Sequence, residues 1–184
     1  MPPTESGQRS GPTRRDPAWL WILAGALLVA RVGTGIQEER HPPQRPDLMP
    51  WVPALEAPAL AQSTGKPIMY DFSAEWCGPC QRMQAEVFAD EKMTHAIGTF
   101  VVPVHIVDRQ QEDGHNPALV DSLERAHRVT AFPTIVIVGA DGRALDRIEG
   151  YPGPRELVTW ISRAGMKARL SGIGGKPGST PLFP

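Results

Sequence analysis

Residues 71–80 read DFSAEWCGPC, and Cys77 and Cys80 within this stretch are the only cysteines among the 184 residues of the chain. Neither thiol therefore has another partner in the chain. A disulfide between them closes a very short ring, which removes little conformational entropy from the unfolded chain. At this spacing the two sulfurs can instead lie on the first turn of a helix, where they can attack, release and close again. The pair thus predicts redox chemistry rather than a crosslink that stabilises the fold.

The residues around this stretch alternate between strand and helix patterns. The run 68–72 predicts a short strand, and the helical spacing of the apolar residues after Cys77 predicts a helix over 80–89. Pro103 lies within an expected strand over residues 100–107 and cannot donate a hydrogen bond to a neighbouring strand. This strand is therefore expected at an edge of the sheet or with a bulge. The order of elements predicts an α/β domain with three layers and a mixed sheet, antiparallel at its hairpin end. In chain order, the other expected elements are a helix over 55–62, a helix from Asp90 as N-cap to Gly98, a strand over 100–107, a polar loop over 108–116, a helix from Pro117 to about His127, a hairpin of strands 134–138 and 143–148, and a helix over 155–164.

The two ends of the chain differ from this middle, because most of the 20 prolines and 18 glycines crowd there. Residues 1–17 are polar and are expected to be disordered. Residues 37–50 are charged and proline-rich and predict an extended linker. The compact domain is expected over 51–164, and residues 165–184 are expected to form a disordered tail.

An uncharged apolar run from Ala18 to Ala30 follows the basic residues Arg14 and Arg15. The segment 18–36 fits an uncleaved membrane anchor or a cleaved signal segment, and a third alternative is an apolar segment that packs on a partner. Positive charge before the run favours a cytoplasmic N-terminus and an extracytoplasmic domain. Such a location is usually oxidising.

Charge and ligand spacing argue against several other kinds of function. Lys and Arg total 19 and Asp and Glu total 20, so the formal charge of −1 gives no reason to expect a nucleic-acid partner. A zinc site would need two more ligands at matching spacing. A c-type haem site would need a histidine directly after the second cysteine, where Gln81 stands. The five histidines show no ligand spacing and are expected to be surface or structural residues, so we expect no metal and no cofactor.

The stretch 71–80 closely resembles the active-site segment of thioredoxins. Phe132-Pro133-Thr134 resembles their cis-proline loop, and Asp141-Gly142 with Glu149-Gly150 resembles their closing hairpin and the glycine after it. The resemblance covers about residues 49–164 and implies a thioredoxin fold. The leader and linker resemble those of membrane-tethered thioredoxin-like proteins of bacteria, which implies anchoring in the inner membrane, or export, with the domain in the periplasm.

The resemblance also implies roles for individual residues. Cys77 would lie just before a helix, where free N–H groups and the helix dipole favour a thiolate, and is the expected attacking sulfur. Cys80, one turn further and expected to be more buried, is the expected resolving thiol. Asp71 is the expected buried carboxyl that exchanges a proton with the resolving cysteine, since burial raises the pKa of an aspartate. The alternative for Asp71 is a solvent-facing residue at a strand end.

The other candidate residues are expected to form the substrate-binding face. Gly78 and Pro79 would fix the turn between the cysteines, and Trp76 would shield the sulfurs and form part of the docking face. Phe132 and Pro133 would present backbone to an incoming substrate strand.

Two departures from the family lie beside Asp71. Thioredoxins usually carry an aromatic residue where this chain has Ser73, and a lysine in the region occupied here by Val104 or His105. These departures bear on the expected proton exchange between Asp71 and the resolving cysteine. They do not bear on the assignment of the two cysteines.

These observations predict a thiol–disulfide oxidoreductase that reduces disulfides of exported proteins through a mixed disulfide. Gly-Pro between the cysteines resembles the reducing members of the family, whose potentials lie near about −270 mV. Because the surroundings are expected to be oxidising, the resemblance implies a membrane electron donor. The alternatives are an oxidase or isomerase that donates its disulfide, and a non-catalytic binding or assembly factor that uses the groove beside Pro133.

Overall fold

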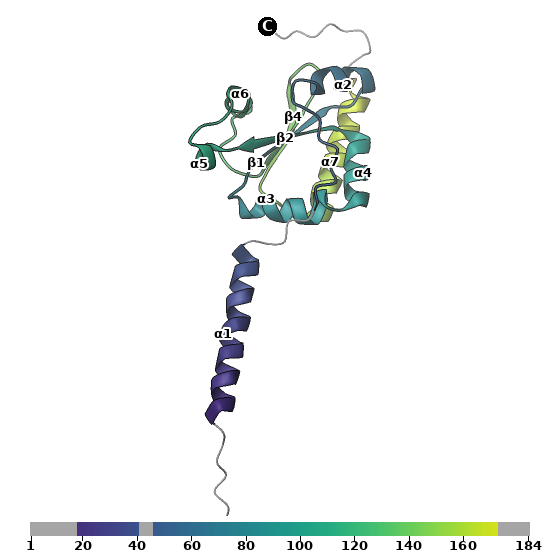
Figure 1. Ribbon diagram of the computed structural model, residues 1–184. Helices are drawn as coiled ribbons and strands as arrows, with labels where there is room; N and C mark the ends of the chain where they lie inside the picture. Colours follow the sequence, from purple (N-terminus) through teal and green to yellow (C-terminus); the bar gives the residue numbers. More distant parts are fainter. Residues whose placement is uncertain (1–17, 41–45, 173–184) are drawn as a thin grey trace, which may run out of the picture. The chain divides into compact units, whose positions relative to one another are not determined.

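The computed structural model describes residues 18–40 and 46–172 (Figure 1). The chain divides into two compact units, Met1–Pro43 and Gln44–Pro184. The predictions for residues 1–17 and 173–184 lie outside the described residues.

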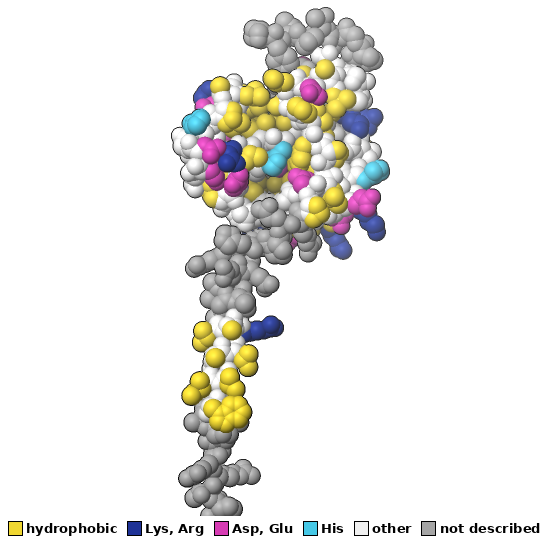
Figure 2. Space-filling view, viewed as in Figure 1, with side chains coloured by type: hydrophobic (Ala, Val, Ile, Leu, Met, Phe, Trp, Pro, Cys, Tyr) yellow, Lys and Arg dark blue, Asp and Glu magenta, His cyan; other side chains and the backbone are white. Residues whose placement is uncertain are grey.

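The described part of the first unit is one helix, α1 (Ala18–Arg40). It contains the predicted apolar segment and continues through residues 37–40, which were predicted to belong to an extended linker. The described side chains of α1 are exposed, and many of them are hydrophobic (Figure 2). Across residues 18–40 and 46–172, no helix combines the length and the apolar character needed to cross a membrane.

The second unit is built on a four-stranded mixed sheet in the order β2 (Val102–Asp108), β1 (Ile68–Ala74), β3 (Thr134–Val138), β4 (Ala144–Glu149). β1 pairs with β2 in parallel and with β3 antiparallel, and β3 and β4 form an antiparallel hairpin. β2 is an edge strand, which confirms the expectation from Pro103.

Helices cover both faces of this sheet and complete the three predicted layers (Figure 1). They are α2 (Ala57–Thr64), α3 (Gly78–Met83), the π-helix η1 (Gln84–Phe88), α4 (Glu91–Phe100), α5 (Gln110–Asp113), α6 (Ala118–Ala126) and α7 (Pro154–Leu170). Because side chains alternate along a strand, Met69 of β1 packs with residues of η1, α4 and α7 on one face. Its neighbours Ile68 and Tyr70 pack with residues of α2 and α6 on the other. Asp71 therefore shares a face with Met69, on the side of α3.

Several elements of the second unit differ from the sequence-based expectations, and the helix predicted over 80–89 is divided into α3 and the π-helix η1. α4 continues through Gly98 to Phe100, because one glycine in a helix interior costs only about 1 kcal/mol, which packing against the core offsets. α7 extends to Leu170, six residues past the predicted end at 164, and Ala164, Gly165 and Ala168 are buried along it. The predicted polar loop 108–116 contains the short helix α5.

Gly165 lies where α7 passes close to α4, and its replacement by alanine is expected to destabilise the domain. A Cβ at this position would lie 2.9 Å from both the Cβ and the backbone oxygen of Phe100, and backbone has little room to move. We expect Gly165→Ala to lower the free energy of unfolding by about 1–3 kcal/mol, measured by urea denaturation. Gly98→Ala is the matched control, because the space around that helical glycine is open and alanine favours helix. A stabilising effect of Gly165→Ala would contradict the close packing of these helices.

Candidate active site

The site lies where the buried strand β1 ends and helix α3 begins. All seven residues of β1 are buried, and the strand ends at Ala74. The backbone N–H of Cys77 donates to the carbonyl of Ala74 at 3.2 Å, so the chain turns at once into the helix. Pro79 lies in the first turn of α3, where its missing N–H leaves no helical hydrogen bond unmade.

Cys77 is the N-cap of α3. Its Sγ accepts a hydrogen bond from the backbone N–H of Cys80 at 3.2 Å. Helix N-termini present N–H groups and the positive end of the peptide dipoles, and both lower the pKa of a thiol placed there. This geometry favours Cys77 as the thiolate of the reduced protein.

The structure holds the pair in the oxidised form, with a Cys77–Cys80 disulfide of 2.07 Å and a Cα–Cα distance of 5.2 Å. Both residues are buried, Cys77 with 2% and Cys80 with 6% of its surface exposed. The expectation that Cys80 is the more buried residue is therefore wrong for this form. Phe132 packs against the cluster formed by Ala74 and both cysteines, and the two cysteines are nearly equally buried. The attacking and resolving roles of the two cysteines are therefore argued from their positions at the start of α3 and not from their exposed fractions.

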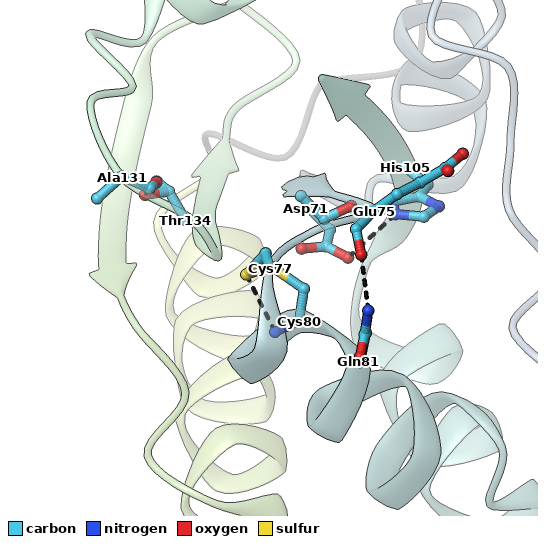
Figure 3. The surroundings of a disulfide bond; sticks show 9 residues. Asp71, Glu75, Cys77, Cys80, Gln81, His105, Ala131 and Thr134 are labelled. Atoms are coloured by element: carbon cyan, nitrogen blue, oxygen red, sulfur yellow. Dashed lines mark hydrogen bonds and ion pairs between the residues drawn. A yellow bond between two sulfur atoms is a disulfide. The ribbon is translucent and has the colours of Figure 1, made fainter. Parts of the chain in front are cut away.

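The loop before β3 faces this disulfide. The Phe132–Pro133 peptide bond is cis, as the resemblance to thioredoxins implied. Figure 3 shows Ala131 and Thr134, which flank these two residues, opposite the disulfide. The Thr134 hydroxyl donates to the Ala131 carbonyl at 2.7 Å, and the N–H of Gly150 donates to the Pro133 carbonyl at 2.8 Å. These bonds tie the loop to the start of β3 and the end of β4.

Two aromatic rings flank the disulfide. Trp76 and Phe132 meet edge to face, with ring centroids 5.9 Å apart. Half of Trp76 is exposed, as a residue of a docking face would be. Gly78 is exposed beside it, and a Cβ there would meet nothing within 4 Å.

Asp71 lies beneath the active-site turn, and 1% of its surface is exposed. Neither carboxyl oxygen has a hydrogen-bond partner among the described residues. Burial, with a smaller effect from the negative charge of Asp47, raises the pKa of Asp71 to about 8. The solvent-facing alternative for this residue is therefore wrong, and the protonated carboxyl is the main form at neutral pH. Figure 3 shows Asp71 between the disulfide and His105.

His105 is the residue of this site that the sequence did not assign. It pairs with Asp71 in the register of β1 and β2, and its Nε2 lies 3.8 Å from the Asp71 Oδ2. The same nitrogen lies 2.6 Å from the hydroxyl of Ser73. The ring of Trp51 stacks on the imidazole with centroids 4.9 Å apart. The two positions at which the chain departs from the family thus contact each other.

A charged group fixes the other side of the turn. Arg109, which follows β2, forms ion pairs with Glu75 and with Asp113 of α5. Its backbone N–H donates to the Asn116 side chain at 2.6 Å. In Figure 2, acidic and basic side chains lie side by side at the edge where Figure 1 places α5. Arg109 thereby joins the segment after β2 to Glu75, the residue before Trp76.

A cysteine pair at a helix start, facing a cis-proline loop above a buried carboxyl, is the arrangement of a thiol–disulfide exchange domain. The sequence profile of the thioredoxin-like domain matches residues 56–165, more than half of the chain. The chain therefore belongs to the thioredoxin-like family of disulfide oxidoreductases.

Similar proteins agree with this assignment. The thiol:disulfide interchange protein DsbD of Salmonella paratyphi A is 34% identical over 86 residues, which are 46% of this chain and 14% of that protein. The chloroplastic thioredoxin Y2 of Arabidopsis thaliana is 29% identical over 105 residues, 57% of this chain and 55% of the relative. The chain thus spans only a small part of the DsbD relatives and about half of the plant thioredoxin.

Solved structures show the same fold. The DsbH oxidoreductase superposes with a TM-score of 0.57 at 25% identity, covering 67% of this chain and 89% of that one. A thioredoxin from Thermus thermophilus gives a TM-score of 0.56 at 26% identity, covering 68% and 93%.

Proposed function

We propose that this protein reduces disulfides of partner proteins through a mixed disulfide on Cys77, and that Cys80 resolves it. The observation that carries the proposal is the position of Cys77 as N-cap of α3, with the cis-proline loop packed against the cysteine cluster through Phe132. A thiolate at that position is the nucleophile that thiol–disulfide exchange requires.

The proposed cycle balances as follows. The Cys77 thiolate attacks a partner disulfide, one partner sulfur leaves as a thiolate and takes a proton from solvent, and a Cys77–partner disulfide forms. The carboxylate form of Asp71, which is the minor form at neutral pH because the pKa is raised to about 8, takes the proton of the Cys80 thiol. The Cys80 thiolate then attacks the Cys77 sulfur and displaces the second partner thiolate. The Cys77–Cys80 disulfide that remains is the form present in the structure.

The other proposed site residues form the face that a partner would meet. Trp76 and Phe132 offer an aromatic surface beside the sulfurs. Backbone groups of the loop around Pro133 would pair with an extended partner segment, while Gly78 leaves open space above the turn. Gly78 and Pro79 between the cysteines support the reducing direction.

We also propose that the domain works outside the cytoplasm and takes two electrons for each cycle from a dithiol donor at the membrane. The supporting observation is the basic and then apolar leader, with Arg14 and Arg15 before the run 18–30. In an oxidising compartment the reduced pair would not persist without such a donor. Fractionation of cells that produce the full chain tests this location.

The proposal is tested by insulin reduction together with the reduction potential of the pair. With dithiothreitol as electron source, we expect the protein to accelerate precipitation of the insulin B chain. Equilibration with glutathione buffers should give a potential near about −270 mV. Protein alkylated at both cysteines is the control.

A potential near about −120 mV would identify an oxidase instead. Rescue of scrambled ribonuclease without net insulin reduction would identify an isomerase. The absence of all exchange activity would favour a binding or assembly factor.

A further inference from the structure

A cavity of about 240 Å³ lies between α6, the sheet and the turn from β3 to β4. It is on the face of the sheet opposite Asp71, because Tyr70, which lines it, precedes Asp71 in β1 and side chains alternate along a strand. No residue of α6 is fully buried, so this helix leaves space between itself and the sheet. Apolar cavities of about 150 Å³ bind benzene, so a ring with a small substituent has room here.

The floor and the mouth of this cavity differ in exposure. Tyr70 of β1 and Val138 of β3 are buried and belong to the floor. Ala126 near the end of α6 and Ala144 at the start of β4 are exposed and belong to the mouth. A molecule can therefore enter from solvent and reach buried side chains.

Two polar groups that line the cavity have no hydrogen-bond partner among residues 18–40 and 46–172, namely the Tyr70 hydroxyl and the ring nitrogens of His127. Tyr70 is only 6% exposed, and the centroids of the two rings lie 5.4 Å apart. A tyrosine hydroxyl this deep in a protein normally has a partner. The two groups therefore mark the place where the polar group of a bound molecule would lie.

The backbone holds His127 in place and leaves its ring nitrogens available. The Arg147 guanidinium donates to the His127 carbonyl at 2.6 Å and to the Arg128 carbonyl at 3.2 Å. These bonds tie the end of α6 to β4. A site that is already ordered loses little conformational freedom when a ligand binds.

The cavity is uncharged at neutral pH. Among the described residues that line it, none is Asp, Glu, Lys or Arg. Burial raises the pKa of Tyr70. Burial, and to a smaller extent the positive charge of Arg147, lower the pKa of His127. An ion would lose its hydration here without meeting an opposite charge, so the lining favours a neutral molecule.

We propose that this cavity binds a small neutral molecule with an aromatic ring and one hydroxyl group, of the chemical class of phenol. The hydroxyl lies against Tyr70 and His127, where it can accept one hydrogen bond and donate another. The ring packs against Leu123 and Val138 and against the aromatic faces of the two polar residues. The site is separate from the cysteine pair, and the inference does not depend on the proposed function.

The test titrates phenol into the isotopically labelled full chain and follows the backbone amide signals by NMR. We expect saturable shifts at Tyr70, Leu123 and His127, with a dissociation constant of about 1 mM or tighter. Toluene has the same ring without the hydroxyl and should bind about tenfold more weakly. The absence of saturable shifts would mean that the cavity takes up water only and overturns the inference. Shifts confined to residues around Trp76 and Phe132 overturn it as well.

Three variants locate the site. Tyr70→Phe keeps the ring and removes the hydroxyl, so phenol should bind about fivefold more weakly while toluene binds as before. Ala126→Leu places a larger side chain at the mouth and should abolish binding of both molecules, which provides a second test if Tyr70→Phe does not fold. Ala118→Leu is the matched control, because Ala118 is exposed on the same helix and does not line the cavity. Unchanged phenol affinity in Tyr70→Phe or in Ala126→Leu contradicts the proposal.

Discussion

Cys77→Ser is expected to abolish insulin reduction, with a loss of at least about a thousandfold. Thiol–disulfide exchange uses the thiolate as nucleophile, and a serine hydroxyl is not ionised at any pH at which the protein is folded. Serine nearly preserves the size of the side chain, so its N-cap position at the start of α3 should survive. The rate of B-chain precipitation with dithiothreitol measures the loss.

Cys80→Ser is the informative partner of that variant. The attack by Cys77 should persist, but the mixed disulfide should no longer be resolved, so a covalent complex with the substrate should accumulate on non-reducing gels. This comparison is needed because the two residues are nearly equally buried in the disulfide form. Accumulation of the complex in Cys77→Ser instead would reverse the two roles. Gln81→Ala, which removes a hydrogen bond to the Glu75 carbonyl and no thiol, is the control that should keep activity.

Much of this site was predictable because its parts are local in sequence. The strand, turn and helix around residues 71–80 carry their own signals, namely an apolar run, a proline allowed in the first helical turn and helical spacing afterwards. Pro103 predicted either an edge strand or a bulge, since proline lacks the donor that a central strand needs, and the structure shows β2 at the edge.

The polar cluster beside Asp71 could not be predicted in the same way. His105 meets Asp71 only through the register of two parallel strands that lie far apart in sequence. A shift by one residue would turn the imidazole to the opposite face of the sheet and bring Val104 into its place. The stacking of Trp51 on His105 depends further on how the segment before α2 folds back onto the domain. The one usable signal in the sequence was the alternation of side chains along a strand, which places Val104 and His105 on opposite faces of the sheet.

The lengths of α4 and α7 show a similar limit. Gly98 is a sound stop signal in isolation, and the residues after 164 have no strong apolar stripe. What extends both helices is their contact, in which Gly165 lets α7 approach the backbone of Phe100. Tertiary packing of this kind overrides local propensity.

Asp71→Asn is expected to stabilise the oxidised protein at neutral and alkaline pH. The pKa of this carboxyl is about 8 in the folded protein, above its ordinary value of 3.8. Below pH 3.8 the group is protonated in both states and costs no stability. As pH rises from there towards 8, ionisation favours the unfolded chain by about 1.4 kcal/mol for each pH unit, and the loss is complete above 8. Asparagine is not ionised, so its advantage should grow from near zero at pH 4 to as much as about 4 kcal/mol at pH 7.

Urea denaturation of the oxidised wild type and variant at pH 4.5 and pH 8 measures this difference, and taking the difference cancels the titration of all other groups. Asp146→Asn is the matched control, because Asp146 is exposed on β4 and its replacement should change stability by less than about 0.5 kcal/mol at both pH values. An equal effect of Asp71→Asn at both pH values would mean that the carboxyl ionises normally in the folded state. It would then lack the proton affinity that a base for Cys80 requires near neutral pH. A pH-dependent gain in stability combined with a slower resolution step would show that the fold gives up stability to keep a catalytic base.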